Sequence, residues 1–219
     1  MDQSNVQSQN GVTLVGAGEI DGKDLVESMA LAPVLVAADG GANACFREGV
    51  APIAVIGDFD SILPEALAAF RNARAIRVAE QDSTDFEKCL SRIDAPFVVA
   101  VGFTGKRLDH TLAVLSLMAR QVGPPVILLG RDDVTFWVTG EIQLMLPADT
   151  RVSLFPLAEV TGRSTGLRWP IDGLTLEPLG QISTSNQATG PVTLDIDAPG
   201  CAVILPRSAF KLALTATRG

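Results

Sequence analysis

The chain has 219 residues, 47% of them hydrophobic, and is therefore long enough for two domains with buried cores. Its formal net charge of −8 argues against a general nucleic-acid partner, which would need a basic surface. Three widely spaced cysteines, without a Cys-x-x-Cys pair, argue against a disulfide framework or a zinc site and favour a reducing cytoplasm.

The first ten residues are polar and rich in Gln, Asn and Ser, with neither a basic start nor an apolar centre. We expect a frayed terminus there rather than a signal peptide. No stretch of the sequence approaches the roughly 20 apolar residues that a membrane helix needs, so no membrane partner is expected.

The first part of the chain alternates short apolar runs with helical patterns. Because this alternation requires right-handed crossovers, it predicts a parallel sheet in a Rossmann-like α/β domain. Strands are expected at residues 12–15, 34–37, 54–56, 75–78, 97–101 and 126–129, and helices at 24–31, 42–48, 64–70, 83–92 and 109–120.

Beyond about residue 131 the pattern changes to short β-rich runs separated by Gly and Pro, without a clear helical period. Such spacing is typical of a small β-sandwich or barrel. We therefore predict an α/β domain at residues 1–133 and a C-terminal all-β sandwich at residues 134–219. The β-rich runs are residues 135–138, 142–146, 151–155, 174–176, 192–196, 202–205 and 210–214.

Two aspartates, Asp58 and Asp60, follow the third predicted strand. A buried parallel strand at residues 54–56 would deliver them to the carboxyl edge of the sheet, where α/β folds bind ligands. Carboxylates one residue apart suit Mg²⁺, which proteins usually hold by one or two carboxylates together with substrate phosphates. Taken alone, such a motif is more often a solvated acidic turn.

A second acidic segment, Asp-Ser-Thr-Asp at residues 82–85, precedes a predicted helix and is close to a capping box. It also follows a strand, so its carboxylates are expected at the same sheet edge as Asp58 and Asp60. Four aspartates exceed what capping requires, and a divalent cation would relieve their repulsion. The acidic surplus lies in this part of the chain, since residues 1–133 hold 18 acidic and 11 basic residues and residues 134–219 hold seven and six.

Two glycine-containing turns accompany these acids. Gly16-Ala17-Gly18 begins a dinucleotide fingerprint, but Asp21 occupies the third glycine position, so we reject a dinucleotide site. The segment Asp-Gly-Gly-Ala-Asn at residues 39–43 lies between a strand and a helix, where glycines allow close backbone approach and the helix start favours an anion. Its first residue could also cap that helix, and the two roles are compatible.

The loop at residues 102–110 presents Lys106 and Arg107, which suit phosphate binding. Asp109 and the only histidine, His110, follow. A lone histidine is more often a structural hydrogen-bonding residue, but here Asp109 could orient it or it could position a substrate hydroxyl. Because no phosphate-loop motif, kinase signature or nucleophile elbow is present, the acidic segments and the basic loop indicate phosphoryl-type transfer by positioning and electrostatics.

A run of small polar residues, Ser-Thr-Ser-Asn at residues 183–186, stands out in the second part, and Trp169 precedes it. Such a run is usually a turn. It could also line a pocket for a polar heteroaromatic ring, with its hydroxyls and amide as donors and acceptors.

These motifs together resemble the thiamine pyrophosphokinase family. The resemblance rests on five segments that occur in the family's order, at residues 38–43, 57–61, 82–85, 107–110 and 183–186. It implies an N-terminal α/β domain, a C-terminal β-sandwich and a homodimer whose active clefts form between the catalytic domain of one subunit and the sandwich of its partner. The implied reaction moves the β,γ-diphosphate of ATP to the hydroxyethyl oxygen of thiamine and releases AMP.

The resemblance also implies roles for single residues. Asp58, Asp60 and Asp85 would hold Mg²⁺ bound to the triphosphate. The residues beside the phosphates and the attacking hydroxyl would be Arg107, Asp109 and His110. The remaining substrate-binding residues would be Asp39, Gly40, Gly41, Asn43, Asp82, Thr84, Lys106, Trp169, Ser183, Thr184, Ser185 and Asn186, the last two helping to form the thiamine pocket.

Three positions depart from the family pattern. Phe103 and Lys106 replace glycines in the loop before the arginine, and Val114 stands where asparagine is common. Phe103 restricts the loop, whereas Lys106 adds a cation compatible with phosphate binding. Two other functions fit the motifs: a Mg²⁺-dependent phosphohydrolase acting on a nucleotide or a thiamine phosphate, and a nucleotide-sensing module that binds ATP without turnover.

Overall fold

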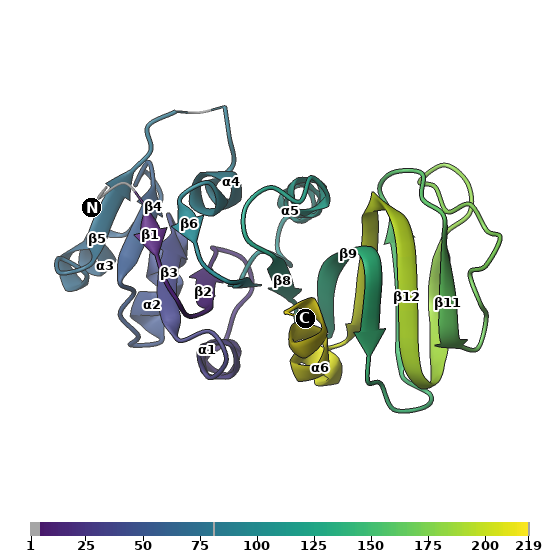
Figure 1. Cartoon of the computed structure of the whole chain (residues 1–219). Coiled ribbons are helices and arrows are strands. Elements are labelled where there is room, and N and C mark those ends of the chain that lie inside the picture. The colour runs from purple at the N-terminus through teal and green to yellow at the C-terminus, as the bar shows by residue number, and fades with distance from the viewer. Residues whose placement is uncertain (1–4, 81, 219) are drawn as a thin grey trace. The chain divides into compact units, whose positions relative to one another are not determined.

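The computed structural model describes residues 5–80 and 82–218 (Figure 1). The chain forms two compact units. The first comprises the chain up to Leu117 together with Val122–Gly130, and the second comprises Met118–Gln121 together with the chain from Arg131 onward. Among the residues described, no helix has the length and apolar character needed to span a membrane.

The first unit is built on a parallel sheet with strand order β8-β7-β2-β3-β4-β5. Every residue of β2, β4 and β7 is buried, which explains why these strands read as short apolar runs. The mixed α/β class predicted from the sequence is confirmed. The strands are β2 (Val12–Val15), β3 (Val34–Ala38), β4 (Ala54–Gly57), β5 (Arg74–Arg77), β7 (Val98–Val101) and β8 (Val126–Leu129).

Local signals in the sequence start the helices of this unit. Asp21 caps α1 in a reciprocal capping box with Asp24. Pro64 occupies the first turn of α3, and the hydroxyl of Thr84 caps α4 by accepting from the backbone N–H of Glu87 at 3.2 Å. The helices are α1 (Gly22–Met29), α2 (Gly41–Arg47), α3 (Pro64–Ala69), α4 (Asp85–Leu90) and α5 (Leu108–Ala119).

The sheet determines where the polar motifs meet. Because its strands are parallel, the segments that follow β2, β3, β4, β5 and β7 emerge at one edge. These segments contain the Gly16 turn, Asp39, Asp58, the 82–85 segment and the loop with Lys106. The sequence motifs thus lie at a common edge although they are far apart along the chain.

The beginning of the chain differs from the frayed terminus that we predicted. Val6–Gln7 forms strand β1, which pairs in parallel with β6 (Ile93–Asp94), and Val6 is fully buried. A single valine among polar residues gives no periodic signal, so this pairing could not be read from the sequence. Residues 1–4 of the predicted terminus lie outside the described residues.

In the second unit, β12 pairs with β9, β10 and β11. The runs predicted at residues 135–138 and 142–146 both fall on strand β9, which ends at Leu144, and those at 192–196 and 202–205 both fall on β12. Glycines with positive φ, such as Gly140 and Gly200, lie within these strands without ending them. The register between β9 and β12 shifts where β12 passes from Ile196 to Cys201. The strands are β9 (Asp133–Leu144), β10 (Arg151–Pro156), β11 (Gly162–Leu167) and β12 (Ser183–Pro206).

Two further predictions for this unit were wrong. The run at residues 210–214 is helix α6 (Phe210–Thr217), preceded by the 3-10 turn η1 (Arg207–Ala209). Phe210, Ala213 and Leu214 are buried at helical spacing, and α6 packs on β9, but the run is too short for its period to be recognised. The run at residues 174–176 forms only an isolated bridge to Val160, whereas the polar strand β11 was not predicted.

Candidate active site

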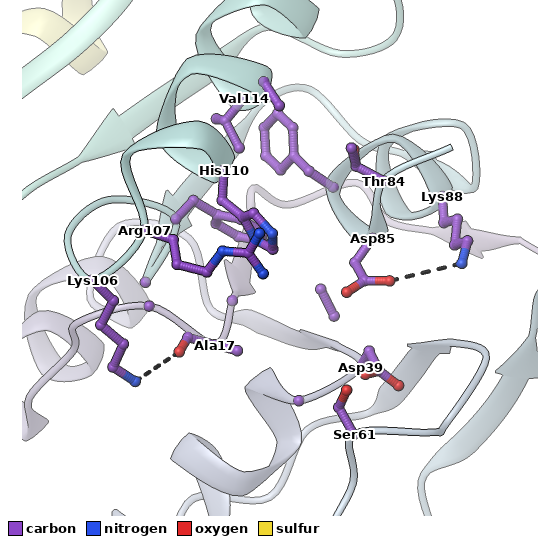
Figure 2. A pocket seen from close by; sticks show the side chains of 18 of the residues that line it. Ala17, Asp39, Ser61, Thr84, Asp85, Lys88, Lys106, Arg107, His110 and Val114 are labelled. Carbon is purple, nitrogen blue, oxygen red and sulfur yellow. Dashed lines mark hydrogen bonds and ion pairs between the residues drawn. The ribbon is translucent and has the colours of Figure 1, made fainter. Parts of the chain in front are cut away.

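A cavity of about 460 Å³ lies in the first unit, lined by the segments that follow the parallel strands (Figure 2). Figure 2 shows Asp85 and Lys88 on one side of this cavity and Lys106, Arg107 and His110 on the other. Gly41, Asn43, Asp82 and Asp109 are not among its described lining residues. The residues singled out from the sequence that do line it are Asp39, Gly40, Asp58, Asp60, Thr84, Asp85, Lys106, Arg107 and His110.

Three carboxylates form an acidic cluster at this cavity. Asp39, Asp58 and Asp60 each place an oxygen within 4.8 Å of the other two. Asp39 is buried at 1% exposure, whereas Asp60 is exposed. From the sequence we expected Asp39 to line the cleft or cap the following helix. It lines the cavity, whereas the capping role was wrong, because the N-cap of α2 is Gly40 and no side chain caps that helix. Such a set of oxygen donors suits a hard divalent cation.

The loop after β4 is held from both sides. The backbone N–H of Phe59 donates to Asp39 Oδ1 at 2.9 Å, and Phe59 adopts a left-handed conformation with φ 72°. The guanidinium of Arg77, on β5, lies 5.6 Å from the Phe59 ring centre and donates to the carbonyl oxygen of Asp58 at 3.3 Å. These contacts fix the direction in which Asp58 and Asp60 point.

Two residues predicted to bind substrate support the site in the structure. The amide of Asn43 donates to the carbonyl of Ser61 and accepts from the N–H of Leu63, both at 2.8 Å, so it fastens the loop after β4 to α2. At Gly41, a Cβ atom would lie 2.0 Å from the carbonyl oxygen of Val15, so only glycine lets α2 start this close to β2. Direct substrate contact by either residue stays a prediction.

A buried lysine lies among the carboxylates, and the sequence motifs did not single it out. Lys88 is 3% exposed, and its Nζ donates to Asp58 Oδ2 at 3.1 Å and lies 3.8 Å from Asp85 Oδ1. Burial alone would lower the pKa of Lys88, but the hydrogen bond and charge of Asp58, with the charges of Asp85 and Glu80, raise it above its usual value. Lys88 is therefore a charged ammonium at neutral pH.

The electrostatics of Asp85 reflect the crowding of acids. Desolvation raises the pKa of the Asp85 carboxyl, and the charges of Asp39, Asp58 and Asp60 raise it further, against the lowering effect of Lys88. Lys88 thus offsets only part of the negative charge at this side of the cavity. A divalent cation would complete the compensation.

The β7–α5 loop brings the basic side chains. Lys106 donates from Nζ to the carbonyl of Ala17 at 2.9 Å, and Arg107 makes a two-point pair with Asp109 at 3.1 and 2.5 Å. The hydrogen bond and charge of Arg107 lower the pKa of Asp109. In the structure the Asp109 carboxylate therefore orients Arg107, a partner that the sequence did not indicate.

The cavity also has an apolar wall. Phe103, one of the departures from the family pattern, has its ring centre 4.7 Å from that of Phe86 on α4. Val114, a second departure, lines the same cavity and is buried. The cavity thus combines an acidic side, a basic loop and apolar surface, which suits a polyphosphate attached to an organic group.

In the second unit, residues 183–186 begin strand β12 rather than forming a turn. Asn186, 2% exposed, donates to the carbonyl of Trp169 at 2.6 Å and accepts from the Trp169 N–H at 3.1 Å. The Trp169 side chain is 54% exposed, and the Arg168 guanidinium lies 5.0 Å from its ring centre. The structure therefore brings Trp169 and Asn186 together through the backbone of Trp169.

Two family models match the sequence. "Thiamin pyrophosphokinase, catalytic domain" matches residues 26–128, and "Thiamin pyrophosphokinase, vitamin B1 binding domain" matches residues 141–200. The chain is similar to thiamine pyrophosphokinase 1 of Oryza sativa subsp. japonica, with 30% identity over 199 residues, covering 74% of this chain and 75% of that protein. It is also similar to thiamin pyrophosphokinase 1 of Caenorhabditis elegans, with 28% identity over 174 residues, covering 70% and 71% of the two proteins.

Solved structures share the fold. Thiamin pyrophosphokinase from Candida albicans superposes with a TM-score of 0.77 at 18% identity, covering 93% of both chains. Thiamin pyrophosphokinase from Geobacillus thermodenitrificans gives a TM-score of 0.74 at 23% identity, covering 90% of this chain and 96% of that one.

Proposed function

This chain belongs to the thiamin pyrophosphokinase family, and on that premise we propose that the cavity of its first unit binds ATP with Mg²⁺ and is the place of diphosphate transfer. The family's reaction transfers the β,γ-diphosphate of ATP to thiamine, giving thiamine diphosphate and AMP. The observation that carries the proposal is the acidic cluster lying at the same cavity as Lys106 and Arg107. Carboxylates alone would repel a triphosphate, whereas a divalent cation between them reverses the sign of the interaction.

Asp58, Asp60 and Asp85 are the proposed ligands of Mg²⁺, and the buried carboxylate of Asp39 adds negative charge beside them. Two of these ligands fit a hard cation, since Asp58 and Asp60, together with Asp39, each place a carboxylate oxygen within 4.8 Å of the other two. Asp85 lines the same cavity. When bound, Mg²⁺ would neutralise the triphosphate oxygens as charge shifts toward the leaving AMP.

The protein's own task is positioning. Lys106 and Arg107 hold the phosphates, and Asp109 keeps the Arg107 guanidinium in a fixed orientation. The thiamine oxygen attacks the β-phosphorus, the bond from that phosphorus to the α–β bridging oxygen breaks, AMP departs with that oxygen, and the hydroxyl proton is released to solvent. His110 lines the cavity and lies beside that hydroxyl in the proposed arrangement.

We propose that the second unit is a β-sandwich that binds thiamine through Trp169 and residues 183–186. We further propose a homodimer in which this surface of one subunit completes the catalytic cavity of its partner. Asn186 holds the backbone of Trp169, and the Trp169 side chain is more than half exposed; this supports the assignment, because an exposed aromatic side chain suits a ring-shaped substrate. The three cysteines are buried and free, which supports the proposed location in a reducing cytoplasm.

One assay tests the proposed function: AMP formation from ATP and Mg²⁺, measured with and without thiamine. We expect one AMP for each thiamine diphosphate and neither product without thiamine or without Mg²⁺. Phosphate or pyrophosphate release without thiamine would instead identify a phosphohydrolase. ATP binding without any turnover would identify a nucleotide-sensing module.

A further inference from the structure

Lys88 is a positive charge built into the acidic side of the cavity. It comes from α4, is 3% exposed, and contacts Asp58 at 3.1 Å and Asp85 at 3.8 Å. Figure 2 shows its ammonium reaching Asp85 along the side of the cavity. An ammonium this buried is stable only when paired, and both of its partners are proposed metal ligands.

The Lys88 contact also fixes the orientation of Asp58 without a metal. Oδ2 of Asp58 accepts from Lys88, and Oδ1 accepts from the backbone N–H of Asp60 at 3.3 Å. Each carboxylate oxygen has further lone-pair capacity, so the contact orients Asp58 and leaves it able to bind a cation. Removing Lys88 would therefore change the charge of the site more than its capacity for metal ligation.

We propose that Lys88 is the resident counter-cation of the acidic cluster and makes metal binding depend on the triphosphate. This inference rests on the proposed function, because it assumes that Asp58 and Asp85 hold Mg²⁺. A divalent cation arriving alone meets the like charge of Lys88 among the same carboxylates, so its net attraction is reduced. A metal–triphosphate complex brings its own negative charges, which interact favourably with Lys88 as well as with the basic loop.

The consequence is a coupling between metal and nucleotide. Each increases the affinity of the protein for the other by the same factor, as linkage requires. Lys88 increases this factor because it opposes the metal and attracts the phosphates. The carboxylates of the site then stay ordered without a metal, and the site binds the metal–nucleotide complex in preference to the metal alone.

The test is a titration of the full-length protein with Mn²⁺, followed by electron paramagnetic resonance, without and with a non-hydrolysable ATP analogue. Lys88→Met and Lys88→Gln remove the charge at similar length, Lys88→Arg keeps it, and Lys23→Met removes an exposed lysine of the same unit as a control. We expect both neutral variants to bind Mn²⁺ alone at least about tenfold more tightly than the wild type and to show a smaller coupling to the analogue. Lys88→Arg and Lys23→Met should stay close to the wild type.

Thermal unfolding provides a second readout, because tighter Mn²⁺ binding must give the neutral variants a larger Mn²⁺-induced rise in Tm. Unchanged or weaker Mn²⁺ binding by both neutral variants would overturn the inference. Failure of the proposed function is distinguishable: there, wild type would not bind Mn²⁺ even with the analogue, or Asp58→Asn would bind it as well as wild type.

Discussion

The two units use their polar side chains in different ways. In the first, Asp58, Asp85 and Lys88 interact with one another at a cavity and leave uncompensated negative charge there. In the second, the buried amide of Asn186 forms hydrogen bonds with the backbone of Trp169. One unit concentrates charge where a reaction can use it, whereas the other uses polar groups to fix the shape of a surface.

This difference indicates a division of labour. Charged groups held at a cavity change the energy of a transition state, so their loss should reduce kcat. Groups that hold a recognition surface in shape should affect stability and substrate affinity. Substitutions in the first unit should therefore mainly lower kcat, whereas substitutions in the second unit should mainly change stability and substrate affinity.

The largest effect is expected in the first unit. Asp58→Asn removes a proposed metal ligand and half of the Lys88 ion pair, and should reduce kcat for AMP formation by about 10³-fold or more while the circular dichroism spectrum is kept. Glu65→Gln is the matched control, because it removes an exposed carboxylate from α3 in the same unit. Turnover of Asp58→Asn within tenfold of the control would contradict the metal assignment.

A smaller effect is expected for Asn186→Ala in the second unit. The change leaves backbone groups of Trp169 without their partner, which should cost about 1–3 kcal/mol in the free energy of unfolding and raise the KM for thiamine. Urea unfolding and steady-state kinetics measure the two quantities. Thr189→Ala, which removes an exposed hydroxyl from the same strand, should cost a few tenths of a kcal/mol. A fall in kcat for Asn186→Ala with unchanged stability would contradict the assignment of catalysis to the first unit and recognition to the second.

Phe103→Gly restores the residue that is usual in the family and should have a modest effect. Loss of the ring contact with Phe86 should destabilise the protein by about 1 kcal/mol, and kcat should stay within about tenfold of the wild type. Thermal unfolding and AMP formation provide the measurements. A loss comparable to that of Asp58→Asn would show that Phe103 belongs to the machinery of transfer.

The smallest effect is expected for Asp85→Asn on the metal-free protein. Since the folded-state pKa of Asp85 is raised, the folded chain holds this proton more tightly than the unfolded chain, and stability falls as pH rises through that pKa. At pH 7 the neutral amide should therefore raise the metal-free Tm by roughly one or two degrees and abolish the further rise that Mg²⁺ produces. A lower metal-free Tm at pH 7, with the wild-type response to Mg²⁺, would contradict this account.

Much of the first unit could be predicted from the sequence, because parallel strands buried on both faces read as apolar runs and their following loops meet at one edge. Asp58, Asp60 and Asp85 were expected at this edge by that argument. Lys88 was missed because a lysine three residues after Asp85 reads as a solvated helix position. Its burial depends on how α4 packs against β4, which no local pattern reports.

The second unit was harder to predict because its decisive features are not local. Strand β12 continues through Pro199 and Gly200, which normally signal a turn. The role of Asn186 depends on Trp169, which lies on a separate segment that the fold brings beside it. Short apolar runs such as residues 210–214 fit a strand or a helix equally well, and packing on β9 decides between them.

The proposal that each cavity is completed by the second unit of a partner subunit is tested most directly by a hybrid dimer. Asp58→Asn in one subunit is combined with Trp169→Ala and Ser185→Ala in the other, using two different affinity tags to purify only the hybrid. If each cavity is completed by the partner's second unit, one of the two sites is intact, and AMP formation should reach about half of the wild-type rate. Activity no higher than that of either parental variant would contradict the account.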